Sequence, residues 1–338
     1  MGDTVHRAIL SRIILSVVLV LILLATLSPL FTKSTPSSSL VDKKVLAKEI
    51  LKMLNMDNIL KHIKELSTHG SRFTGYEGYE WSVDYVYDYL SKDLELNTWI
   101  WSYKALVPYD INSTLTITYP ERRTFRVYAL LPNLIQTCRT PGGVEGKLVY
   151  VGKGEVKDFR GIDVRNNIVL MDYNSKSNWM YAMNLGAKAV VFIEPDLTLR
   201  GEGDYKSLEV PIKFPRVYIK KEDAKYLLSL LAKGDVRARL NVNMYWREVE
   251  VKNVFAFIPG SVGTKSNYTI LLAAHLDAYG IVPALTRGVD ESCSPAALLE
   301  IARILKELKP YWHVLIGFFS GQPLGCLLYT SPSPRDRG

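Results

Sequence analysis

The chain has 338 residues, of which 48% are hydrophobic and 22% are charged, and its formal net charge is +8. This hydrophobic share is ample for a sizeable core and excludes a disordered or fibrous chain. The Lys and Arg residues are scattered and form no basic stripe with interleaved aromatic residues, so nucleic acid is not an expected partner. The cysteines, Cys138, Cys293 and Cys326, form no CxxC pair and give no zinc or redox motif.

The N-terminal region carries an uncharged apolar run over residues 13–31. As a helix, this run is long enough to cross about 30 Å of hydrocarbon. Arg7 and Arg12 precede it, which places residues 1–12 in the cytoplasm by the positive-inside rule. A cleaved signal peptide is the alternative, but the run exceeds the usual apolar core of such peptides. We therefore expect a single-pass membrane protein whose bulk is extracytoplasmic, with a Ser/Thr/Pro linker over 32–41.

Periodic patterns indicate an α/β chain beyond the linker. An amphipathic helical pattern covers residues 40–66, with Asp57 as the expected N-cap of its second part. Residues 144–245 have the pattern of a small α/β module. From Val251 onward, apolar strands alternate with a helix expected over 294–308. Such strands predict a mixed or mostly parallel sheet that is covered on both faces.

Polar residues with metal-ligand chemistry follow one of these apolar strands. The stretch "AAHLDAYG" places His275 and Asp277 at a strand end, where α/β folds usually carry their active groups. Asp290 and Glu291 stand at the mouth of the next helix. Imidazole and carboxylate are ligand types that zinc accepts, and Asp277 would orient the His275 ring. The alternatives are a hydrogen-bonded core histidine and two acids that cap the helix.

Four consecutive stretches resemble a known family. They are "NVFAFIPGS", "LLAAHLDA", "GVDESCSPAALLEIARIL" and "GFFSGQPLG", and together they are similar to the signature of the zinc aminopeptidases and glutamate carboxypeptidase II-like proteins, a group that also contains the transferrin receptor. The resemblance covers about residues 42–325. It implies a three-layer peptidase core built from residues 42–130 and 249–325, the latter being only the first part of the zinc-peptidase region. Residues 131–248 would be an inserted α/β module similar to a protease-associated domain.

The resemblance also assigns roles to single residues. His275 would bind one zinc, Asp290 would bridge two zinc ions, and Asp277 would hold His275 from behind. Where the family has two consecutive glutamates, a general base and a zinc ligand, this chain has Gln322 and Pro323. Glutamine cannot take a proton at the general-base position, and proline offers no ligand. Because of this departure, two hypotheses about the function remain open.

The first hypothesis is a membrane-anchored zinc exopeptidase, an aminopeptidase or carboxypeptidase that acts on peptides with two zinc ions. The second is a noncatalytic receptor or scaffold on the same fold, with a protein ligand as partner; a homodimer is compatible with either. The family's remaining Asp and His ligands are expected beyond residue 325, whereas residues 326–336 match the translated read-through of a sequencing adapter and residues 326–338 are expected to be an artefactual tail. The printed chain is therefore expected to be inactive.

Overall fold

Two compact units make up the part of the chain that the computed structural model describes, residues 48, 50–199, 201–263 and 268–321. The first unit contains the described residues up to Ala105, Val249–Ala278 and those from Arg287 onward; the second contains Leu106–Glu248 and Tyr279–Thr286. Within the described ranges, no helix is both long and apolar enough to span a bilayer. The apolar run over 13–31 and the tail over 326–338 lie outside these ranges.

A four-stranded mixed sheet forms the centre of the first unit. Its strand order is β1 (Asn97–Asp110), β9 (Met244–Ile258), β11 (His313–Phe319) and β10 (Thr269–His275). Strand β10 runs parallel to β11, and β11 runs antiparallel to β9. The expectation of an α/β chain with a mixed sheet is therefore confirmed. Because β10 runs parallel to its neighbour, its connection to β11 must cross over, and α7 provides this crossover.

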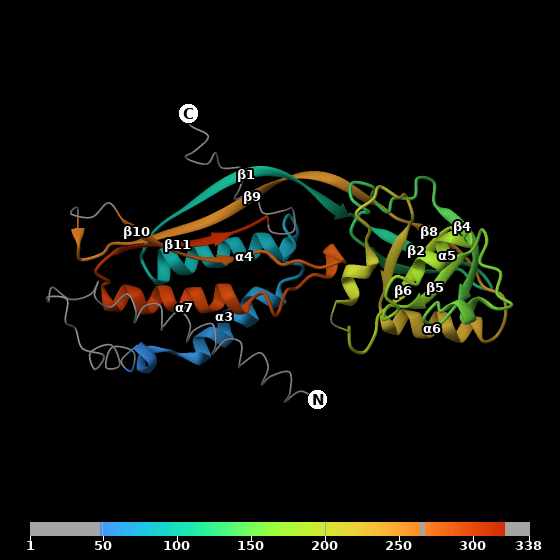
Figure 1. Cartoon of the computed structure of the whole chain (residues 1–338), viewed down its shortest axis with the longest axis horizontal. Helices are drawn as coiled ribbons and strands as arrows, with labels where there is room; N and C mark the ends of the chain where they lie inside the picture. Colours follow the sequence, from blue (N-terminus) through green and yellow to red (C-terminus); the bar gives the residue numbers. More distant parts are fainter. Residues whose placement is uncertain (1–47, 49, 200, 264–267, 322–338) are drawn as a thin grey trace. The chain divides into compact units, whose positions relative to one another are not determined.

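Helices cover one face of this sheet (Figure 1). They are α3 (Met56–Thr68), α4 (Glu77–Asp88), which continues as a π-helical turn over Tyr89–Asp93, and α7 (Cys293–Leu308). Alternate strand residues Val254, Ile316 and Phe318 pack against them in one apolar core. The helix expected over 294–308 is thus confirmed to within one residue. The opposite sheet face presents apolar side chains such as Trp99 and Leu271, which are 41% and 50% exposed. Of the three layers expected, the described residues supply the sheet and one helical layer.

Helix α3 begins earlier than the sequence pattern suggested. Its N-cap is Asn55, whose side-chain oxygen accepts from the backbone amides of Asp57 and Asn58 at 2.9 and 3.3 Å. The prediction that Asp57 is the N-cap is therefore wrong. Asp57 instead lies in the first turn, where its negative charge interacts favourably with the helix dipole. Both residue types suit a cap, so only backbone geometry separates them.

The buried face of α3 carries a histidine, His62, which is 2% exposed. Its Nδ1 atom lies 2.7 Å from the hydroxyl of Tyr85. Burial lowers the pKa of His62 from its ordinary value of 6.5 to about 4. Between pH 6.5 and 4 the unfolded chain therefore binds a proton that the folded chain does not. The contribution of His62 to stability is complete above pH 6.5 and is lost as the pH falls toward 4.

We expect His62→Gln to flatten the pH dependence of stability below pH 6.5. The unmodified chain should lose about 1.4 kcal/mol per pH unit through this group, and the variant should lack that component. Urea unfolding at several values between pH 7.5 and 5 measures the slope. His69→Gln, at an exposed position at the end of α3, is the control and should keep the slope of the unmodified chain. Equal slopes in the unmodified chain and His62→Gln would contradict the assignment.

The second unit is built on a seven-stranded sheet that closes on itself. Its strand order is β2 (Ser113–Tyr119), β3 (Arg123–Ala129), β7 (Arg216–Ile219), β6 (Ala189–Ile193), β5 (Ile168–Asp172), β4 (Val144–Tyr150) and β8 (Arg237–Asn241). Strands β4 to β7 pair in parallel, and β2, β3 and β8 join antiparallel. The helical elements are α5 (Trp179–Asn184), α6 (Lys221–Leu231) and three 3-10 turns, Val156–Phe159, Glu202–Lys206 and Pro283–Leu285.

The short strands of this unit are apolar because both of their faces are covered. Residues of β5 and β6 alternate between two apolar clusters, with Leu170 and Val191 in one and Val169 and Val190 in the other. All four side chains are fully buried. Continuous apolar runs are typical of strands buried on both faces, and this explains the α/β pattern in the sequence. Residues 131–248, the predicted insert, lie within this unit.

Candidate metal centre

His275 is the last residue of β10, at the end of the strand that pairs in parallel with β11. Its side chain is half-buried. The Nδ1 atom of the ring is buried and has no hydrogen-bond partner. A buried ring nitrogen without a partner is costly, and a bound ion or water is one explanation for such a group.

Asp277 follows two residues later and is fully buried. Its Oδ2 atom accepts hydrogen bonds from the Thr74 hydroxyl at 2.6 Å and from the Gly321 amide at 2.8 Å. Its Oδ1 atom is buried and has no hydrogen-bond partner. Burial raises the pKa of Asp277, while the two donors and the nearby His275 act in the opposite direction. One half of this carboxylate is fixed in place and the other half remains available.

His275 and Asp277, which are paired in the sequence prediction, make no hydrogen bond to each other through Nδ1 and Oδ1. Nδ1 of His275 and Oδ1 of Asp277 are both buried and both lack a hydrogen bond. A neutral imidazole that carries its proton on Nδ1 can donate to a carboxylate, which leaves Nε2 as a lone-pair donor for a metal. The donor types at the end of β10 are therefore ones that zinc accepts, and the roles of His275 as ligand and Asp277 as its support stay predictions.

Asp290 and Glu291 lie in the turn before α7, and both are exposed. Neither carboxylate accepts a hydrogen bond among the described residues, and the N-cap position of α7 belongs to Ser292. Neither side chain caps α7, but both acids lie just before its N-terminus, where the helix dipole favours negative charge, so this part of the alternative explanation stands. Their carboxylates remain free for a ligand, as the zinc prediction requires. The bridging role of Asp290 stays a prediction.

The other predicted positions cannot be placed beside these residues. Gln322, at the family's general-base position, and Pro323 lie outside the described residues. Within the described ranges, no group of three or more His, Cys, Asp or Glu side chains could hold a metal ion. A zinc site that used His275 and Asp290, as predicted, would therefore need further ligands from outside the described residues.

Two residues that the sequence did not single out are built into this region. Arg72 and Thr74 lie in the loop between α3 and α4, and both are fully buried. Arg72 donates to the carbonyl oxygen of Gly288 at 2.8 Å and to the hydroxyl of Ser292. Burial lowers the pKa of Arg72 to about 10, against the raising effects of Glu291 and Asp277. The only sequence signal was a glycine-rich loop, which gives no reason to expect a buried arginine.

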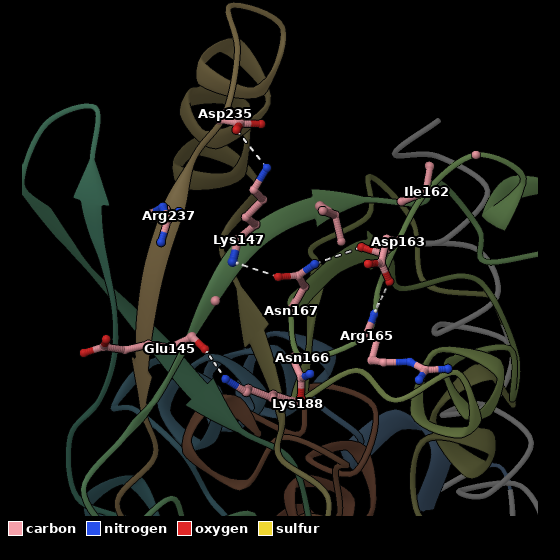
Figure 2. A pocket seen from close by; sticks show the side chains of 13 residues that line it. Glu145, Lys147, Ile162, Asp163, Arg165, Asn166, Asn167, Lys188, Asp235 and Arg237 are labelled. Atoms are coloured by element: carbon pink, nitrogen blue, oxygen red, sulfur yellow. Dashed lines mark hydrogen bonds and ion pairs between the residues drawn. The ribbon is translucent and has the colours of Figure 1, made fainter.

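A separate groove of about 680 Å³ lies on the second unit and is lined by both acids and bases. In Figure 2 its side chains already bind one another: Lys147 pairs with Asp235 at 2.8 Å, and the Lys188 ammonium donates to the carbonyl oxygen of Glu145 at 2.7 Å. The Glu145 carboxylate pairs with Arg239 at 2.9 Å. Only part of the groove's charge is paired in this way, and among the described residues it holds no group of three or more side chains that could bind a metal ion.

The fold is that of solved zinc aminopeptidases. A zinc aminopeptidase structure from Bacillus subtilis matches with a TM-score of 0.58 and 20% identity, over 83% of this chain and 65% of that one. A medium-resolution structure of the same protein matches at 0.55 and 21%, over 83% and 66%. A peptidase precursor from Shewanella amazonensis SB2B matches at 0.49 and 18%, over 82% and 67%. No protein-family model and no curated protein sequence matches the chain.

These similarities are evidence for the fold and not for the function. At about one identical residue in five they show the fold, and one fold can host several functions. The chain also spans only about two thirds of the length of the Bacillus subtilis structures. Function must therefore be argued from the residues at the end of β10.

Proposed function

We propose that the chain carries part of a zinc-dependent exopeptidase of the aminopeptidase or carboxypeptidase type, and that this part is inactive by itself. One observation carries this proposal: His275 Nδ1 and Asp277 Oδ1, two residues apart in the chain, are both buried and without hydrogen bonds, at a strand end of a fold shared with zinc aminopeptidases. Zinc-binding histidines are usually supported by a carboxylate that accepts a hydrogen bond from the second ring nitrogen. The free carboxylate of Asp290 supplies a second ligand of the type zinc accepts.

Each predicted residue of the metal centre would have a separate role. His275 and Asp290 would hold the metal, and Asp277 would fix the tautomer and orientation of the His275 ring. When bound, zinc supplies Lewis-acid polarisation of a peptide carbonyl group. Gln322 stands at the general-base position but has no titratable group, so it can orient a polar partner without accepting a proton.

A noncatalytic receptor or scaffold is the second candidate. The specific observation that favours it is the pair Gln322 and Pro323, which replaces the two glutamates of the family pattern. In that case a protein ligand would take the place of a peptide substrate. Both candidates share the proposed placement, with residues 13–31 as a membrane anchor and the bulk of the chain outside the cytoplasm, and both leave room for a homodimer.

Zinc titration by calorimetry tests the proposed site. Gln322 and Pro323 supply neither of the two carboxylates that the family pattern has at these positions. We therefore do not expect two tight stoichiometric zinc sites, but only weaker zinc binding that depends on His275. His275→Gln and Asp290→Asn should each weaken this binding at least about tenfold. The control, His69→Gln, changes an exposed histidine and should bind as the unmodified chain does. Binding that survives His275→Gln would refute the site, and two tight sites would refute the predicted loss of ligands.

A further inference from the structure

The segment Ser71–Thr74 is buried although it connects two helices. The exposed fraction is 2% for Ser71 and 0% for Arg72, Phe73 and Thr74. Connecting loops normally run over the surface, because their backbone polar groups need partners. Because residues 71–74 of this connection are buried, they must be held by specific contacts with their surroundings.

The Arg72 side chain binds the turn that carries Asp290. Its guanidinium donates to the Gly288 carbonyl oxygen at 2.8 Å and to the Ser292 hydroxyl, so it contacts residues on both sides of Asp290. A third bond, to the carbonyl oxygen of Leu66 at 3.0 Å, anchors the same guanidinium to the last turn of α3. Gly288 has a φ of +64°, and a Cβ atom there would lie 3.0 Å from Arg72 and 2.2 Å from Ala278. The turn therefore packs closely against the arginine.

The same segment also binds the residues that follow His275. The Thr74 hydroxyl donates to Asp277 Oδ2 at 2.6 Å, and the Arg72 carbonyl oxygen accepts from the Ala278 amide at 3.0 Å. Within three residues, the segment thus contacts the strand end behind His275 and the turn around Asp290. These two places are the predicted sources of metal ligands, and a hydrogen-bonded support of this kind fixes the orientation of a ligand.

We propose that Arg72 and Thr74 are positioning residues of the metal centre, which together set the placement of Asp290 relative to His275. Thr74 acts through Asp277, and Arg72 acts through the turn between Gly288 and Ser292. This inference rests on the proposed zinc site. If the segment had only a structural role, its substitutions would lower the stability of the unit. Variants of equal stability would then bind zinc with equal affinity.

Thr74→Val tests the proposal with little change of shape. The variant removes the hydroxyl that holds Asp277, whereas Thr74→Ser keeps it. Thr68→Val removes an exposed threonine hydroxyl of α3 and serves as the surface control. Val83→Ala creates a small cavity under α4 and serves as a control that is destabilised without touching the segment. Arg72→Lys keeps the buried charge but loses the fork-shaped contacts.

Two measurements separate the outcomes. With the metal alone as probe, Thr74→Val and Arg72→Lys should bind Zn²⁺ at least about tenfold more weakly, Thr74→Ser should restore the affinity, and both controls should match the unmodified chain. In the metal-free protein, Thr74→Val should speed amide hydrogen exchange about fivefold over both 275–278 and 287–292, the effect of one lost hydrogen bond.

If Thr74→Val binds zinc through His275 as tightly as the unmodified chain does, the inference is overturned, whereas the proposed function is not affected. A chain that binds no zinc would overturn the proposed function, and exchange then decides the inference. Faster exchange over both segments would support the coupling, whereas faster exchange confined to residues 71–74 would overturn it.

Discussion

Glu202→Gln should destabilise the second unit by about 3–5 kcal/mol, the cost of leaving one member of a buried ion pair alone. Glu202 Oε1 lies 2.6 Å from the ammonium of Lys206, and the two side chains are 4% and 0% exposed. The same oxygen accepts from the backbone amide of Ser175 at 2.7 Å. The Lys206 ammonium lies over the rings of Tyr173 and Phe192, at 5.2 and 5.0 Å from their centroids. Burial already lowers the pKa of Lys206, so loss of its carboxylate leaves a poorly solvated charge.

Urea unfolding followed by hydrogen exchange of second-unit peptides measures this effect. Glu145→Gln breaks an exposed pair with Arg239 and should produce no measurable change. The double variant Glu202→Leu with Lys206→Met should recover much of the lost stability, because both buried charges are then removed. Stability in Glu202→Gln within about 1 kcal/mol of the unmodified chain would contradict the assignment.

Glu300→Ala should destabilise the first unit by about 2–3 kcal/mol, because it removes charge-assisted hydrogen bonds of a buried carboxylate. Glu300 lies on α7 and is fully buried. Its carboxylate accepts hydrogen bonds from the backbone amide of Asn55 at 2.8 Å and from two side-chain nitrogens of Arg303 at 2.7 and 3.0 Å. Since Asn55 is the N-cap of α3, this carboxylate joins the start of α3 to the middle of α7. Its removal should loosen α3 and take from Arg303 one of its two carboxylate partners.

Glu307→Ala is the matched control for this change. Glu307 binds the same arginine at 2.6 Å, but its side chain is 52% exposed. Its loss should cost less than about 1 kcal/mol. Denaturant unfolding of the three proteins gives the comparison, and hydrogen exchange over residues 56–68 shows whether α3 loosens first. Equal stability of Glu300→Ala and Glu307→Ala would refute the bridging role of Glu300.

The sequence was most informative where periodicity decides the outcome. The helix expected over 294–308 is found at Cys293–Leu308, and the strand that ends at His275 is found where its apolar run placed it. These elements have long apolar patterns with a clear period, which local sequence can specify. The start of α3 was missed because Asn55 and Asp57 have similar capping chemistry.

Contacts between distant segments could not be predicted in this way. Arg72 meets Ser292 across 220 residues, and Thr74 meets Asp277 across 203. A charged or hydroxyl side chain in a loop is usually solvated, so its burial depends on a partner that only the fold brings near. Glu300 was hidden for the same reason, since a glutamate on a helix normally faces water. The residues that support the candidate centre therefore became visible only with the structure.

Zinc K-edge absorption of the zinc-loaded chain tests the central claim most directly, because it reports the atoms that bind the metal. We predict nitrogen and oxygen neighbours at about 2.0–2.2 Å, with an imidazole contribution that disappears in His275→Gln. A spectrum unchanged by His275→Gln, or sulfur at about 2.3 Å, would contradict a metal centre built on His275 and Asp290.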